Sequence, residues 1–146
     1  MLTLEIFKSP KELEKYLYLM ESNRANTIIY ASIQQVLERL ADKGQEWYAI
    51  TYRGDRRNLE GYLSAVRVDN WKDYYLHINM PESYSVDDMT DVAADVCKVN
   101  NSPQVEPVIK CTCDAGLEGN NIEVTVIVPK FDLTWHFGKM WDDNSR

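Results

Sequence analysis

Residues 47–80 read WYAITYRGDRRNLEGYLSAVRVDNWKDYYLHINM, and this run sets the expected architecture. Three segments in it, at 47–52, 59–68 and 74–79, are rich in aromatic and β-branched residues, which strands favour. The two breaks between them contain Gly, Asp and Asn, which turns favour. We therefore predict three consecutive strands that pair as an antiparallel meander.

Patterns on both sides of this run predict further elements. Residues 1–7 alternate as a half-buried strand does, and apolar residues recur at helical spacing in 10–22, in 29–44 and in 86–99. Ser9 and Ser85 are expected N-caps of the first and third of these helices. Residues 27–30 either begin the second helix or form a short strand. Two last strands, at 105–113 and 122–128, flank a loop rich in Gly and Asn that suits a hairpin.

This order of elements predicts one α+β domain over residues 1–146. We expect a single, mainly antiparallel sheet of five to six strands with about three helices packed on one face. A chain of 146 residues with 45% apolar content is large enough to bury such a core.

Composition favours a cytoplasmic protein. No window approaches the roughly 20 consecutive apolar residues of a membrane span, and acidic residues interrupt the first twenty positions, where a signal peptide needs an apolar core. Three cysteines are few for a chain of this length and cannot all pair with one another, so they do not indicate a disulfide framework and we expect them to be reduced.

The net charge of −7 is unevenly distributed along the chain. Residues 1–80 contain 11 basic and 11 acidic residues, whereas residues 81–146 contain 5 basic and 12 acidic ones. A phosphate backbone would be repelled by the second half, so direct binding to nucleic acid is disfavoured. A basic protein partner is expected instead.

The helix predicted at 86–99 concentrates this charge. Asp87, Asp91 and Asp95 are four residues apart and lie in one row, with Asp88 beside them and Glu82 just upstream. Like charges at this spacing repel each other, which favours a partner-binding role. The alternative is an ordinary solvated helix face whose first-turn acids favour the helix dipole.

The C-terminal segment alternates apolar and polar residues from Phe131 to Phe137 and predicts a last strand. One interpretation is a core strand that completes the sheet. The other is that Trp135 or Trp141 is partly exposed and anchors a partner, because Trp is enriched at interface hot spots.

Few residues suggest catalysis or metal binding. Cys111 and Cys113 could face one ion, with Cys97 and His136 as the remaining candidates, but a structural zinc site normally uses a second ligand pair that is not present here. His77 and His136 have no nucleophile motif beside them, and the glycines form no nucleotide-binding fingerprint. We predict no metal, no cofactor and no catalytic residue.

The sequence therefore favours a non-enzymatic acidic binding protein without membrane contact. Its concrete form is an inhibitor of a basic enzyme that handles nucleic acid, such as an immunity protein or a phage-type antagonist. Two alternatives stay open. One is a small hydrolase or transferase that uses His77 or His136 with nearby carboxylates, and the other is an oligomeric structural protein.

Overall fold

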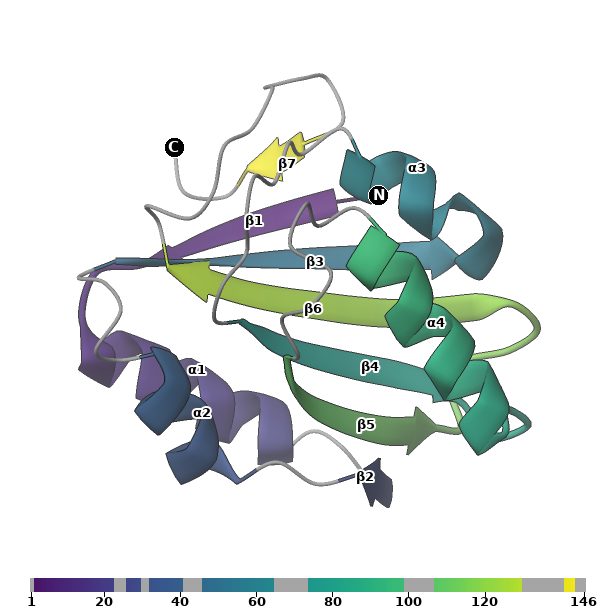
Figure 1. Cartoon of the computed structure of the whole chain (residues 1–146), viewed down its shortest axis with the longest axis horizontal. Helices are drawn as coiled ribbons and strands as arrows, with labels where there is room; N and C mark the ends of the chain where they lie inside the picture. Colours follow the sequence, from purple (N-terminus) through teal and green to yellow (C-terminus); the bar gives the residue numbers. More distant parts are fainter. Residues whose placement is uncertain are drawn as a thin grey trace.

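The computed structural model of the chain describes residues 2–22, 26–29, 32–40, 46–64, 74–98, 107–129 and 141–143. Figure 1 shows the elements in chain order. They are β1 (Leu2–Phe7), α1 (Pro10–Ser22), β2 (Asn26–Ile29), α2 (Ile33–Leu40), β3 (Trp47–Asp55), the 3-10 helix η2 (Arg56–Asn58), α3 (Leu59–Ser64), β4 (Tyr75–Pro81), α4 (Val86–Lys98), β5 (Val108–Asp114), β6 (Asn121–Pro129) and β7 (Trp141–Asp143).

The seven strands in the described part of the chain belong to one sheet in the order β2-β5-β4-β6-β3-β1-β7. Five longer strands form its centre, and the short strands β2 and β7 lie at its two edges. Four of the strand pairs are antiparallel, while β4 with β5 and β1 with β7 are parallel. The predicted class, α+β with a single and mainly antiparallel sheet, is confirmed, and residues 26–29 form a strand.

The predicted meander is wrong in its middle and in its pairing. Its second segment begins with the helix α3, and residues 65–73 lie outside the described part of the chain. Leu59 and Leu63 are both buried and are four residues apart, the spacing of one helix face, and the β-branched residues of the segment follow only after α3. Strands β3 and β4 do not touch either, because β6 pairs antiparallel with both and lies between them.

The expected hairpin between the last two long strands is also wrong. Strand β4 lies between β5 and β6, so the connection at 115–120 crosses the end of β4. Its turns are closed by hydrogen bonds from the Leu117 N–H to the Asp114 carbonyl and from the Asn121 N–H to the Glu118 carbonyl, both 3.1 Å. Neighbouring strands are about 4.8 Å apart, so six residues easily span the gap.

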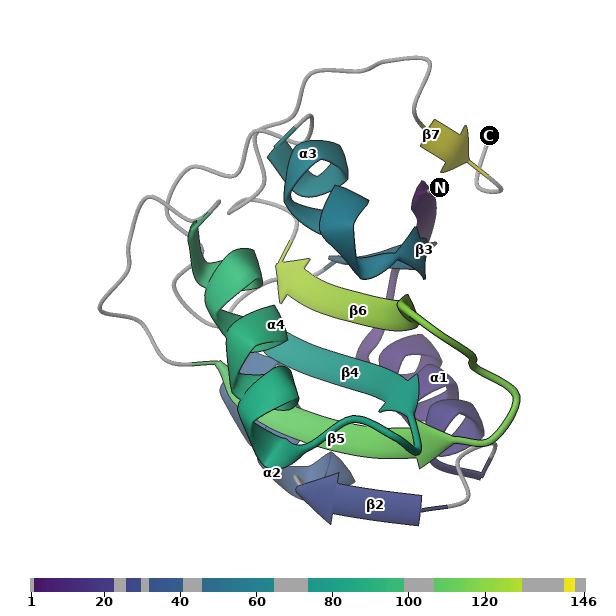
Figure 2. The ribbon, with the colours of Figure 1, turned by 90° about the vertical axis from the view of Figure 1, so that its right-hand side faces the viewer.

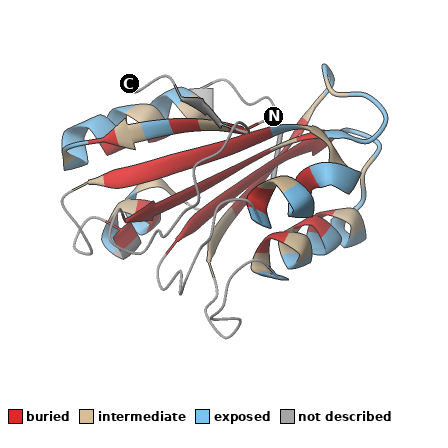
Figure 3. Cartoon of the chain, turned by 90° about the horizontal axis from the view of Figure 1, so that it is seen from above, coloured by how far each residue is buried: buried red, intermediate tan, exposed pale blue. Residues whose placement is uncertain are grey.

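Helices cover both faces of the sheet, not one as predicted. Figure 2 shows α3 and α4 on one side of the strands and α1 on the other. Two separate clusters of buried apolar side chains correspond to this arrangement: Leu59, Leu63, Met89, Val92 and Val96 join one, and Leu13, Leu17, Val36 and Leu40 join the other. The helices expose their outer sides, while the strands between them are mostly buried (Figure 3).

Both predicted N-caps are confirmed. The Ser9 hydroxyl accepts from the Glu12 N–H at 3.2 Å, and the Ser85 hydroxyl accepts from the Asp88 N–H at the same distance. A third cap, which the sequence analysis did not identify, begins α2, where Ser32 and Gln35 exchange hydrogen bonds. None of the described helices combines the length and apolar character that a membrane crossing requires.

Candidate functional site

Four of the acidic residues singled out from the sequence lie on α4 and Glu82 lies in the turn before it, and they have different roles. Asp88 belongs to the helix start, because its carboxylate accepts from the Ser85 N–H at 2.8 Å and from the Ser85 hydroxyl at 3.1 Å. These bonds, and Arg56 nearby, hold the pKa of Asp88 below its usual value. Asp88 is thus a capping residue and offers less of its charge to a partner than predicted.

Arg56 reaches the acidic side of α4 from the 3-10 helix η2. Its guanidinium lies 3.6 Å from the carboxylates of both Asp88 and Asp91, and over the ring of Tyr84 at 5.9 Å from the centroid. The Arg56 N–H also donates to the Asn120 carbonyl at 2.7 Å, which fixes the start of η2. Arg56, more than 30 residues earlier in the sequence, thus partly neutralises the acidic row. The sequence contains no local signal for this contact.

Asp95 is paired too, with Lys98 at 3.4 Å, and only a quarter of its side chain is exposed. Three acidic side chains of the predicted set remain turned to solvent: Glu82, Asp87 and Asp91, the last with 68% of its side chain exposed. We call these three residues the acidic face. Val86 lies among them as one of the exposed large apolar residues of the described chain, at 56%.

The C-terminal candidates are only partly placed. Trp135 and the strand expected at 131–137 lie outside the described residues, as does His136. Trp141 begins β7, which pairs in parallel with β1 from Leu2 onward. The C-terminal end of the chain therefore adds a strand at the sheet edge.

The cysteines are free thiols. Cys111 and Cys113 are two residues apart on β5 and buried, and desolvation raises the pKa of Cys111 to about 12 and that of Cys113 as well. Within the described ranges, no three His, Cys, Asp or Glu side chains are grouped as a metal site requires.

His77 is buried in the central strand β4, with 1% of its surface exposed. Its Nε2 lies 3.1 Å from the Thr112 hydroxyl, which donates to the Asn79 Oδ1 at 2.9 Å. Because that hydroxyl has a single proton, the Nε2 of His77 must be the donor. The Asn79 amide then donates to Asp114 at 3.1 Å, so a series of hydrogen bonds runs from His77 through Thr112 and Asn79 to this carboxylate.

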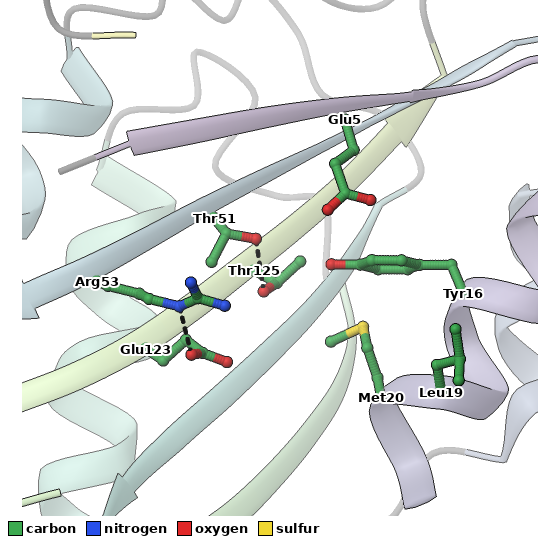
Figure 4. Close-up of a pocket in the computed structure, with 8 residues that line it drawn as sticks. All are labelled: Glu5, Tyr16, Leu19, Met20, Thr51, Arg53, Glu123 and Thr125. Atoms are coloured by element: carbon green, nitrogen blue, oxygen red, sulfur yellow. Dashed lines mark hydrogen bonds and ion pairs between the residues drawn. The ribbon is translucent and has the colours of Figure 1, made fainter. Parts of the chain in front are cut away.

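A pocket of about 340 Å³ lies between α1 and the sheet, on the face opposite α4. The sequence analysis named none of its residues. Figure 4 shows side chains from α1, β1, β3 and β6 converging on it. The lining residues are Glu5, Tyr16, Leu19, Met20, Thr51, Arg53, Glu123 and Thr125.

Polar pairs form the sheet side of this pocket. Arg53 donates to Glu123 at 2.7 Å across β3 and β6, and the hydroxyls of Thr51 and Thr125 are 3.0 Å apart. Desolvation raises the pKa of Tyr16, the Glu5 carboxylate raises it further, and the hydroxyls of Thr51 and Thr125 act against both. Desolvation also raises the pKa of Glu5, with Arg53 opposing it. The pocket is therefore partly dry, and two carboxylates and one guanidinium line it.

The sequence contains one signal for this pocket, which is the alternation of polar and apolar residues along two of its strands. Thr51 and Arg53 on β3, and Glu123 and Thr125 on β6, alternate with apolar residues that face the other side. Two such segments in one sequence do not reveal that their strands are neighbours. Register between residues 70 or more positions apart is a property of the folded chain.

Comparison with known proteins shows likeness in fold. No family model and no curated protein matches the chain. An FtsZ dimer structure from M. jannaschii superposes on 81% of this chain and 36% of its own with a TM-score of 0.59 at 16% identity. An FtsZ mutant from the same organism matches 54% of this chain and 25% of its own chain, with a TM-score of 0.41 at 21% identity. The thiamine monophosphate kinase of Aquifex aeolicus matches 84% of this chain and 42% of its own chain, with a TM-score of 0.35 at 11% identity.

At this identity the first superposition shows a shared fold alone, and this chain spans about a third of that FtsZ chain. The other two superpositions are too loose to bear on the fold. None of these comparisons supports an enzymatic activity.

Proposed function

We propose that the chain is a non-enzymatic binding protein that presents the acidic face of α4 to a basic protein partner. The carrying observation is that Glu82, Asp87 and Asp91 are exposed together, and that of these three the ion pairs in the described part of the chain involve Asp91 alone, with Arg56 at 3.6 Å. Asp87 and Asp91 are one helical turn apart, about 6 Å along the axis. Such a row attracts a basic surface and speeds the encounter with it.

The partner that suits this face best is an enzyme that handles nucleic acid. Such enzymes expose basic grooves for phosphates, and about 6 Å is close to the spacing of successive phosphates along a strand. Val86, exposed beside Asp87, adds an apolar contact next to the charges, and interfaces combine apolar contacts with a polar rim in this way. The expected role is inhibition, as in an immunity protein or a phage-type antagonist, in the cytoplasm, where the free thiols would persist.

Two alternatives have weaker support. An enzyme that uses His77 would need to expose it, whereas its 1% exposure and its bond to Thr112 suit a structural role. Self-association is motivated by the positions of β2 and β7 at the two edges of the sheet, where a strand of a second copy could pair. Light scattering of the purified chain separates a self-associating protein from a monomeric binder.

Affinity capture with matched variants tests the proposal. Glu82→Lys/Asp87→Lys reverses two exposed residues of the acidic face, neither of which has an ion-pair partner among the described residues. Glu14→Lys/Glu38→Lys makes the same change in net charge on α1 and α2. We expect the native chain and this control to retain one basic protein from the host extract, and the acidic-face variant to lose it.

Equal retention by all three proteins would contradict a role for the acidic face. Retention of a partner that is not basic would contradict the electrostatic argument itself.

A further inference from the structure

The pocket between α1 and the sheet has an excess of one negative charge among its lining residues. Arg53 and Glu123 form an ion pair at 2.7 Å, and their charges cancel. Glu5 is the third charged residue of the lining, and no ion pair within the described ranges involves it. Its side chain reaches solvent, and Figure 4 shows its carboxylate directed toward the Tyr16 hydroxyl.

The pKa values of Tyr16 and Glu5 reflect burial and the nearby charges. Desolvation is the main cause of the raised pKa of Tyr16, and the carboxylates of Glu5 and Glu123 add to it. The pKa of Glu5 is itself raised by desolvation more than Arg53 lowers it. A cation placed between Glu5 and Tyr16 would relieve both effects, because it favours the charged form of an acid.

The opposite wall is apolar. Leu19 and Met20 belong to the last turns of α1, and Leu19 has 54% of its surface exposed. An aliphatic stem could lie along these two side chains while its charged end reaches the carboxylate. The volume of about 340 Å³ is at the lower end for ligand pockets and suits one long side chain or a small amine.

We propose that this pocket binds a guanidinium or ammonium group carried on an aliphatic stem. The cation pairs with Glu5 and donates to the Tyr16 hydroxyl, and the stem packs on Leu19 and Met20. The site lies on the face of the sheet opposite α4, so it is independent of the acidic face. Two sources of this chemistry exist: a basic side chain of a protein, or a free amine.

Nuclear magnetic resonance titration of the ¹⁵N-labelled full chain tests the proposal with three probes. N-acetylarginine methylamide represents the side chain of a protein, agmatine a free amine, and N-acetylcitrulline methylamide the same shape without charge. We expect the two cations to shift the backbone amides of Thr51, Arg53, Glu123 and Thr125, and the citrulline probe to leave them unchanged. Tighter binding of capped arginine than of agmatine identifies a protein side chain as the source, and the reverse order a free amine.

Three variants complete the design. Glu5→Gln should weaken cation binding about tenfold, as loss of a charge-assisted hydrogen bond does. Glu60→Gln on α3 makes the same charge change at an exposed residue and should have no effect. Leu19→Ser, at an exposed position, should weaken binding of the stem with the fold intact.

The proposal is overturned if the citrulline probe binds as well as the cations, if neither cation shifts the pocket amides, or if Glu5→Gln and Glu60→Gln bind equally. None of these results would alter the capture experiment on the acidic face, so the two proposals fail separately.

Discussion

Arg56 lies 3.6 Å from Asp91, and this contact joins the 3-10 helix after β3 to a helix more than 30 residues later in the chain. The same guanidinium contacts Asp88 and the ring of Tyr84. One residue thus docks η2 and α3 against α4 and at the same time screens part of the acidic face.

Replacement of Arg56 by Gln separates these two effects. We expect the free energy of unfolding to fall by about 1 kcal/mol, because partly exposed ion pairs and cation–π contacts each contribute up to about that much. The acidic face becomes more negative, so association with a basic partner should become faster. Urea unfolding and stopped-flow association measure the two changes, and a variant that is less stable and also slower to associate would contradict this account.

Ser85→Ala removes the cap of α4. We expect a loss of about 1 kcal/mol of stability, since the hydroxyl accepts from the Asp88 N–H and donates to its carboxylate. Ser83→Ala, at an exposed neighbouring position, is the control.

The cap also has a pH dependence with a defined sign. The pKa of Asp88 is lower in the folded chain than in the unfolded one. Its contribution is therefore complete above the unfolded pKa, ordinarily near 3.8, and is lost as the pH falls through the lower folded value. The stability difference between the native chain and Ser85→Ala should shrink at acid pH, by the part that comes from the bond between the Ser85 hydroxyl and the Asp88 carboxylate. A stability difference that is constant down to the acid transition would show that Asp88 does not depend on the cap.

The Thr51–Thr125 pair tests the polar floor of the pocket. Both hydroxyls are buried, 3.0 Å apart, so Thr125→Val leaves the Thr51 hydroxyl with one partner fewer and should cost about 1–3 kcal/mol. Thr51→Val/Thr125→Val removes both polar groups and should recover part of that loss. Chemical denaturation of the two single variants and the double variant gives the coupling energy, and strictly additive losses would argue against the bond.

Cysteine reactivity should follow burial. Cys111 is fully buried and its pKa is raised to about 12, so at neutral pH it is a protonated thiol. Cys97 is partly exposed. We expect alkylation of the native chain to modify Cys97 first and Cys111 only after unfolding, as followed by peptide mass spectrometry. Early modification of Cys111 would mean that β5 opens in the native state.

Local signals in the sequence were enough to predict several elements. Capping serines and apolar spacing defined α1 and α4 within a residue or two, since these interactions join positions three or four apart. Strand pairing was not predictable in this way. Strand β6 follows β3 and β4 in the sequence but lies between them in the sheet. No turn pattern in the sequence indicates this arrangement.

The candidate site was predictable to a similar degree. The acidic row on α4 follows from helical spacing, whereas its partial neutralisation by Arg56 depends on long-range docking. The pocket combines β1, α1, β3 and β6, and its polar residues look like ordinary solvent-facing positions until the strands are placed side by side. Only the end of β6, from Val126 to Val128, is continuously apolar, which indicates cover on both faces there and which the one-face prediction overlooked.

The rate of association with the captured basic partner, measured against salt concentration, tests the central claim most directly. For the native chain we expect the rate constant to fall steeply between low and high salt, because charges at an exposed face act mainly through steering. Glu82→Lys/Asp87→Lys should associate more slowly at low salt and lose most of the salt dependence, while Glu14→Lys/Glu38→Lys should change little. An acidic-face variant with the rate and the salt response of the native chain would contradict the account, and the row on α4 would then be an ordinary solvated helix face.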